Sequence, residues 1–310
     1  MKKFDEVVEA LSFPVSKRPN MIQDAKGNMV RGVGCNVWRE DRNVGIANVS
    51  DTYGLIPHAA SLKPVLAALD GMGFDLKAHY MDHDGRRVMV KALSQQSWSI
   101  GKLPNGQTIN DHGGLLKGTD LTDDRVKLTL LLSNAYDRTQ ALKVMVGAFR
   151  IVCSNGLVVE HPAFKGLNIN LKVVHSQNQT KKLDFVKLGN QVAALYAAME
   201  QQAETWRKMK ATTFSKKALE SIKLNVLAPV VGERNLDKVT ELVTGGQGQD
   251  GSLTLWALYN GVTEHYTAQA EKSKTPVSAH GNLTRKATDF LARLDRWTAE
   301  HPDQLVTVNA

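Results

Sequence analysis

The order of strand-like and helix-like segments constrains the fold more than any other feature of this sequence. From Gly32 to about His175, short runs rich in Val, Ile and Leu are separated by turn residues, which is typical of β-strands. After His175, apolar residues recur every three or four positions, which is the helical period. Because strands come first and helices follow without alternation, we expect an α+β fold with a mostly antiparallel sheet, rather than a doubly wound parallel sheet.

The strands are predicted from apolar runs and from the turns that bound them. Asp82-His-Asp-Gly85 is expected to be a hairpin turn in which the glycine supplies a positive φ. The predicted strands cover Val33–Trp38, Val44–Val49, Phe74–Met81, Arg87–Leu93, Ser97–Lys102, Lys127–Ser133, Ala141–Val152 and Gly166–Val174.

One helix interrupts the strands and five follow them. Ser61 is expected to cap the first helix, with Pro64 in its opening turn. The later helices are predicted from Thr180 to Lys210, from Ser215 onward, and over Leu236–Val243, Leu253–Ala270 and Asn282–Thr298. We therefore expect an irregular arm over residues 1–30 with at most a short helix (Phe4–Leu11), a β-rich domain over 31–178, and a helical region over 179–310 that packs on or beside the sheet.

The apolar runs and the cysteines indicate a soluble protein. The sequence of 310 residues has no uninterrupted apolar stretch of about 18 residues, which is the length that spans a bilayer. No membrane partner is therefore expected. Asp5 and Glu6 fall where a signal peptide would need apolar residues. Cys35 and Cys153 are too few for a disulfide framework and are expected to be small buried residues. These features predict a cytoplasmic location.

The positive charge is concentrated in the middle of the chain. The formal net charge is +8, and residues 138–190 contain 8 Lys/Arg against 2 Asp/Glu. Such a segment is either a solubilising surface or a nucleic-acid contact that attracts phosphates and releases their counterions. The residues predicted to contact nucleic acid are Arg138, Lys143, Arg150, Lys172, His175, Lys181 and Lys182.

Familiar catalytic motifs are absent. The sequence has no P-loop, no dinucleotide-binding GxGxxG unit, no HExxH and no GxSxG motif, and no cofactor is expected. The best metal candidates are His79, Asp82, His83 and Asp84, with Asp111 and His112 as distant partners, although a hairpin turn also explains the cluster at 82–85. Cys153 with His161 or His175 is a weaker thiol–imidazole candidate. An enzymatic function is therefore the less favoured interpretation of the sequence.

Several segments occur in the order found in a known family. They are Val49-Ser-Asp-Thr-Tyr-Gly-Leu-Ile-Pro57, Leu132-Ser-Asn-Ala-Tyr-Asp-Arg138, Phe149-Arg-Ile-Val-Cys-Ser-Asn-Gly-Leu157, His175-Ser and Leu255-Trp-Ala-Leu-Tyr-Asn-Gly-Val-Thr-Glu264. Over residues 30–300 the chain resembles the domain-of-unknown-function 932 family of phage and plasmid proteins. The resemblance implies a mobile-element protein, encoded among DNA-metabolism or anti-defence genes, but no established activity. Where the family often has Asn-Ser-x-Asp-Gly-Ser, this chain has Asn134-Ala-Tyr-Asp-Arg-Thr139.

Three functions are compatible with these features. The first is sequence-tolerant single-stranded DNA binding or annealing in recombination, by an oligomer that uses the central cations and aromatic stacking. The second is a non-enzymatic effector that binds a host defence protein. The third is a metal-dependent enzyme acting on nucleic acid through the histidine and aspartate cluster at 79–84.

Overall fold

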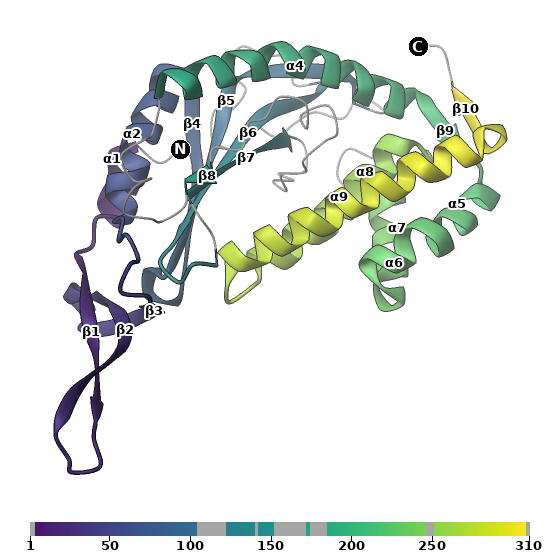
Figure 1. The fold of residues 1–310 in the computed structure, drawn as a ribbon. Coiled ribbons are helices and arrows are strands. Elements are labelled where there is room, and N and C mark those ends of the chain that lie inside the picture. The colour runs from purple at the N-terminus through teal and green to yellow at the C-terminus, as the bar shows by residue number, and fades with distance from the viewer. Residues whose placement is uncertain are drawn as a thin grey trace.

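The computed structural model describes residues 4–103, 122–139, 142–151, 172–173, 185–245 and 251–307. Antiparallel sheets make up the N-terminal half and helices the C-terminal half, so the predicted α+β class is confirmed (Figure 1). The elements in chain order are α1 (Phe4–Ala10), β1 (Val15–Gln23), β2 (Met29–Arg39), β3 (Val44–Val49), α2 (His58–Gly71), β4 (Phe74–Asp82), β5 (Arg87–Lys102), β6 (Asp123–Ala135), β7 (Leu142–Arg150), β8 (Lys172–Val173), α4 (Phe185–Ala211), β9 (Thr212–Phe214), α5 (Lys216–Ile222), α6 (Ala228–Val231), α7 (Leu236–Gly245), α8 (Leu255–Glu271), α9 (Pro276–Glu300) and β10 (Leu305–Thr307).

The main sheet is five-stranded and antiparallel throughout. Its strand order, β4-β5-β6-β7-β8, follows the chain, so each strand pairs with the one before it. The turn at residues 83–85 joins β4 to β5 as predicted, and Gly85 has a φ of 90°. A Cβ atom on Gly85 would lie 2.4 Å from the ring of Phe13, so this position requires glycine for its space as well as its conformation.

The two faces of this sheet are covered by different helices. On β5, Val88 and Val90 are buried in the large apolar core together with residues of α2 and α4. Because side chains alternate along a strand, the neighbouring Met89 lies on the opposite face. There it packs with Leu131 of β6 and Val277 of α9. The sheet is therefore a middle layer between α2 and α4 on one side and the start of α9 on the other.

The helical half packs around aromatic residues. Trp206, Trp256, Tyr266 and Phe290 are almost fully buried and belong to the same core as the sheet. Ser215 caps α5 as predicted, because its side chain accepts a hydrogen bond from the amide of Ala218. Among the helices that the structure describes, none is long and apolar enough to cross a membrane.

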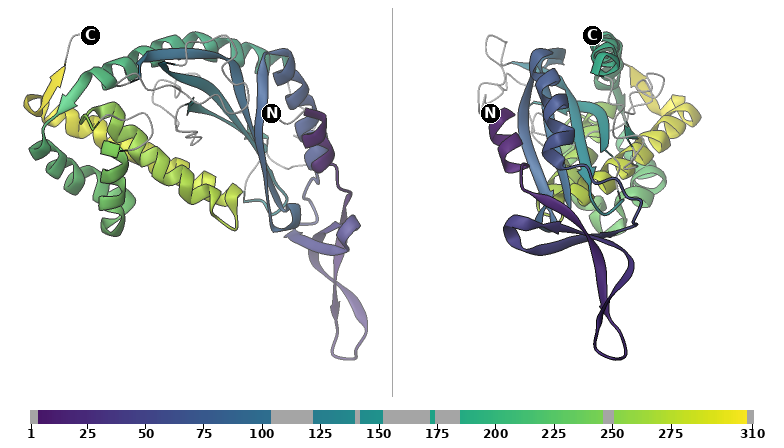
Figure 2. Two further views of the ribbon diagram at one scale, coloured as in Figure 1. Left: turned by 180° about the vertical axis from the view of Figure 1, so that it is seen from behind. Right: turned by 60° about the vertical axis from the view of Figure 1, so that its left-hand side comes forward.

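A second, three-stranded sheet of order β1-β2-β3 follows α1. Residues 15–23 form β1, although the sequence predicts an irregular arm there. The prediction of an arm depended on Pro14, Pro19 and the turn residues Lys26-Gly-Asn28. A proline is nevertheless tolerated in an edge strand, and the pairing shifts register between Pro19 and Met21. The outer part of the β1–β2 hairpin projects away from the helices (Figure 2).

Buried polar contacts join the start of α2 to the main sheet. The His58 ring, at the start of α2, stacks on Tyr136 with centroids 4.0 Å apart. Its Nε2 donates to the carbonyl of Gly85 at 2.7 Å, and its Nδ1 accepts from the amide of Asn134 at 3.0 Å. The predicted cap, Ser61, lies inside α2, and its hydroxyl donates to the carbonyl of His58. The helix therefore begins earlier than predicted, next to Pro57.

Candidate nucleic-acid interface

The last strands of the main sheet bring together lysines that are distant in the sequence. On β7, Lys143 pairs with Ser133 of β6 on one side and with Lys172 of β8 on the other. Residues paired in this way have Cα atoms about 4.5–5.5 Å apart. Because β8 is the outermost of the described strands of this sheet, two of the predicted cations occupy adjacent positions at its edge.

Arg138 lies in the turn that joins β6 to β7, and its side chain is exposed. The preceding Asp137 anchors the turn by accepting hydrogen bonds from the amide of Thr139 at 3.1 Å and from Arg87 at 2.8 Å. Burial acts to raise the pKa of Asp137, but the hydrogen bonds from Thr139 and Arg87 outweigh it and leave the pKa below its usual value. The turn therefore has a fixed carboxylate beside an exposed guanidinium.

The backbone of Arg138 is in the left-handed region, with a φ of 62°. Only glycine adopts this conformation without a steric cost. Glycine is also the residue that the resemblance noted in the sequence often implies at this position. The turn thus keeps the shape that suits glycine, while this chain carries an arginine there.

Arg150 does not lie on the surface that the sequence predicts for it. Its side chain is 3% exposed and forms a double ion pair with Asp124 of β6, with distances of 2.6 and 2.8 Å. Asp124 also accepts from Trp256 of α8 and approaches Lys210 of α4 at 3.4 Å. Burial acts to raise the pKa of Asp124, but Arg150 outweighs it and lowers the pKa. The register Val126–Arg150 accounts for this placement, because it turns Arg150 towards α4 and α8.

The other predicted contact residues, His175, Lys181 and Lys182, lie outside the described residues, as do Asp111, His112, Cys153 and His161. Cys35 is 4% exposed, in agreement with the expectation of a small buried residue. Its thiol donates to the carboxylate of Asp51 at 3.3 Å, and burial is the main reason that its pKa is raised.

Two lysines buried in the main sheet were not singled out from the sequence. Lys91 on β5 and Lys127 on β6 are each 2% exposed. Burial lowers the pKa of Lys91 to about 8, although Glu271 acts in the opposite direction. The available signal was that each lysine interrupts an otherwise apolar strand, as in Val88-Met-Val-Lys-Ala-Leu93. A positive charge inside an apolar run indicates a polar layer on one face of the sheet.

His280 of α9 lies in this layer. It is 0% exposed, and its ring centroid lies 5.0 Å from that of Tyr80 on β4. No residue in the described part of the chain hydrogen-bonds to either of its ring nitrogens. Burial, followed by the nearby charge of Lys91, lowers the pKa of His280 to about 4. At neutral pH the imidazole is therefore uncharged, and Lys91 supplies the positive charge.

The aspartates proposed as metal ligands have other roles. Asp82 is 1% exposed, and its carboxylate accepts from the amides of Val277 and Ser278, at 3.0 and 3.1 Å, and from the Ser278 hydroxyl at 3.0 Å. It therefore caps α9 from the end of β4. Asp84 pairs with Arg42. Within the ranges that the structure describes, no three or more His, Cys, Asp or Glu side chains form a group that could hold a metal ion.

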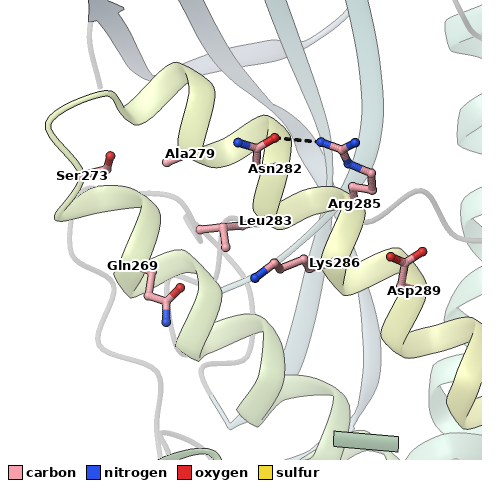
Figure 3. Close-up of a pocket in the computed structure, with 8 residues that line it drawn as sticks. All are labelled: Gln269, Ser273, Ala279, Asn282, Leu283, Arg285, Lys286 and Asp289. Carbon is pink, nitrogen blue, oxygen red and sulfur yellow. Dashed lines mark hydrogen bonds between the residues drawn. The ribbon is translucent and has the colours of Figure 1, made fainter. Parts of the chain in front are cut away.

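A cavity of about 480 Å³ lies between α8 and α9 (Figure 3). Lys286 points across it from α9 towards the α8 side, where Gln269 lies, and Leu283 lies between them. Its lining also includes Arg285 and Asp289, so charges of both signs occur at its rim. In this mixture of charges the cavity differs from the edge of the main sheet, where the backbone register pairs Lys143 with Lys172.

Comparison with known proteins places the chain in a family. A model of one protein family, described as a domain of unknown function (DUF932), matches residues 46–296. The chain belongs to the DUF932 family. The match confirms the resemblance seen in the sequence. The matched range includes α2, the described strands of the main sheet and most of α9. No curated protein and no solved structure matches the chain.

Proposed function

We propose that this chain binds single-stranded DNA without sequence preference and promotes strand annealing in recombination. The observation that carries the proposal is the pairing of Lys143 with Lys172 at the edge of the main sheet, in the same hairpin unit as the exposed Arg138. His175, Lys181 and Lys182 follow β8 in the sequence and extend the same run of positive charge.

The mechanism follows from the chemistry of lysine and arginine. Each cation that meets a phosphate releases a condensed counterion, which favours binding and makes it sensitive to salt. Contacts with phosphates carry no sequence information, so the binding is tolerant of sequence. They also leave the base edges free to pair with a complementary strand, which is what annealing requires.

The biological setting rests on the resemblance to phage and plasmid proteins. A protein of such a mobile element would act on DNA in the host cytoplasm, and recombination is a process in which single strands are exposed. The formal net charge of +8 favours binding to both single-stranded and double-stranded DNA. The edge position of the lysines favours the single strand, which can follow a sheet edge more closely than a stiff duplex.

Fluorescence anisotropy with a labelled oligonucleotide tests the proposal. We expect the purified chain to bind the single strand at low salt, and the double variant Lys143→Glu, Lys172→Glu to bind at least tenfold more weakly. A matched control is Lys216→Glu, Lys217→Glu, which reverses the same charge on exposed positions of α5 and is expected to change affinity about twofold through net charge alone.

Two results would contradict the proposal. One is an absence of single-strand binding by the wild-type chain at low salt. The other is an equal loss of affinity in the edge variant and in the α5 control, which would mean that net charge matters and the sheet edge does not.

A further inference from the structure

The exposed apolar residues of the described chain are concentrated in one element. We define the ribbon arm as residues 17–34, the outer part of the β1–β2 hairpin. Five of the seven large apolar side chains exposed among the described residues lie in it, and the other two are Leu224 and Val306. The five are Met21, Ile22, Met29, Val30 and Val33, with exposed fractions from 38% to 95%. The arm projects from the body of the molecule in both views of Figure 2.

Both faces of the ribbon arm carry these side chains. Ile22 pairs with Val30, so the two share one face, whereas Met21 and Met29 lie at alternate positions that face the other way. β3 pairs only with Cys35–Arg39 of β2. Over the earlier part of β2, which lies in the arm, the sheet is therefore only two strands wide. A two-stranded ribbon with apolar residues on both faces gains little stability of its own, which indicates that the arm contacts something else.

The β1 edge of the arm is unsuited to pairing with another strand. β1 is the outer strand, and Pro19 lacks the amide that a neighbouring strand would need. The register also shifts between Pro19 and Met21. Proline and a bulge are devices that prevent edge-to-edge pairing. At this edge, contacts of the arm are therefore made by its side chains and its tip.

The charge of the arm is complementary to a polyanion. Residues 17–34 contain four basic residues and one acidic residue. The acidic residue is Asp24, and its carboxylate accepts hydrogen bonds from the amides of Lys26 and Asn28 in the turn of the same hairpin. Two of the basic residues pair with acids outside the arm: Arg18 pairs with Glu40, and Arg31, which is 64% exposed, pairs with a half-exposed Asp51. Because exposed ion pairs contribute little, the Arg31 guanidinium can exchange that carboxylate for a phosphate at small cost.

We propose that the ribbon arm is a second nucleic-acid contact, directed at duplex DNA. A two-stranded ribbon has the width that a DNA groove admits. Apolar side chains that project from DNA-binding elements insert between base steps, while flanking cations meet the phosphates. The inference rests on the proposed function, because a duplex is the product of annealing. The sheet edge would then hold the single strand and the arm the duplex that forms from it.

Separate titrations with a single strand and with the duplex of the same sequence test the arm. The double variant Ile22→Ser, Met29→Ser removes one apolar side chain from each face. We expect it to bind the duplex about tenfold more weakly and the single strand within about twofold of wild type. Leu224→Ser, which removes an exposed apolar residue elsewhere, is the matched control and is expected to change neither affinity.

The outcomes separate the arm from the sheet edge. If the edge variant binds the single strand more weakly while the arm variant binds the duplex with wild-type affinity, the arm proposal fails and the proposed function stands. If neither form of DNA binds to wild type at low salt, both fail. Sedimentation of the same variants covers the remaining alternative. A change in oligomeric state with unchanged duplex affinity would show that the arm contacts a second copy of the chain, and would overturn the proposal.

Discussion

Arg138 combines an unfavourable backbone conformation with an exposed positive charge. Its φ of 62° is tolerated best by glycine, yet the chain has arginine there. Because its backbone conformation lowers the stability of the fold and it lies beside the strand edge with Lys143 and Lys172, we expect Arg138 to contribute to DNA binding. The charge and the strain can be separated by substitution.

We predict that Arg138→Gly stabilises the fold and weakens DNA binding. Relief of the left-handed strain, less the greater freedom of glycine in the unfolded chain, amounts to roughly 0.5–1 kcal/mol. Chemical denaturation and anisotropy measure the two effects. Arg138→Ala is the control, because it removes the charge but keeps the strain, so it should weaken binding without a gain in stability. Unchanged DNA affinity in both variants would remove Arg138 from the interface.

His280 makes stability depend on pH. Its pKa is about 4 in the folded chain against 6.5 in a model compound, so between these values the unfolded chain binds more protons. The free energy of unfolding therefore rises with pH through this window, and falls by about 3 kcal/mol as the pH drops from 6.5 to 4. Denaturation at a series of pH values should show this slope in wild type and a much smaller one in His280→Leu.

An exposed histidine provides the control for that experiment. His83 lies in the β4–β5 turn with a φ of 48°, which asparagine tolerates. His83→Asn should therefore keep the wild-type slope. A slope that is the same in His280→Leu as in wild type would show that other groups cause the acid sensitivity.

At the scale of elements, α9 is held on the sheet by a residue distant in the sequence. Asp82 accepts two amide hydrogen bonds and one hydroxyl hydrogen bond from the first turn of α9. Removing a cap of this kind costs about 1–2 kcal/mol. We predict that loss for Asp82→Ala in chemical denaturation, and a change within about 0.5 kcal/mol for Glu241→Ala on the exposed side of α7. Equal stability of the two variants would mean that apolar packing alone positions α9.

The ion pair of Arg150 with Asp124 joins β7 to the helical half. Both side chains are almost fully buried, so Arg150→Ala would leave the Asp124 carboxylate inside the protein with Lys210, at 3.4 Å, in place of its double ion pair. Such losses typically cost about 3–5 kcal/mol. We predict a destabilisation of that size in denaturant titrations, against a negligible one for the exposed Lys217→Ala. A small effect would indicate that water reaches Asp124 in solution.

Local patterns predicted the strands well, and distant contacts explain most differences. Val44–Val49 is a strand with the predicted bounds, because its apolar alternation and flanking turn are local signals. Ser94-Gln-Gln96 was expected to end a strand, but β5 continues through it with an irregular register between Leu93 and Ser97. α9 begins at Pro276 rather than at Asn282; proline at the first helical position is a local start signal that the prediction did not use, whereas the capping carboxylate of Asp82 comes from β4.

The candidate site was predicted only in part, for the same reason. Counting charges located the basic segment, but burial depends on register and on packing against other elements. Arg150 is buried because its strand position faces α4 and α8, which the sequence around it does not reveal. Asp82 resembled a metal ligand because its role as a cap is fulfilled almost two hundred residues later in the chain.

At the scale of the whole molecule, the basic edge and the ribbon arm belong to different sheets. The five-stranded sheet carries Lys143 and Lys172 at its edge, and the three-stranded sheet carries the arm (Figure 1). Arg39 of β2 donates a hydrogen bond to the carbonyl of Asp84, and Arg86 donates one to the carbonyl of Ile46 on β3, so one sheet is joined to the other. Two surfaces held in a constant relation suit a protein that brings two strands together, and the central claim is that one of these surfaces binds phosphates.

The salt dependence of single-strand affinity tests that claim most directly. The logarithm of the association constant should fall linearly with the logarithm of the salt concentration, by about 0.7 per phosphate contacted on a single strand. We predict that Lys143→Gln, Lys172→Gln lowers the magnitude of this slope by about 1.4, which corresponds to two lost contacts. A slope equal to that of wild type would contradict the account, because it would mean that neither lysine meets a phosphate.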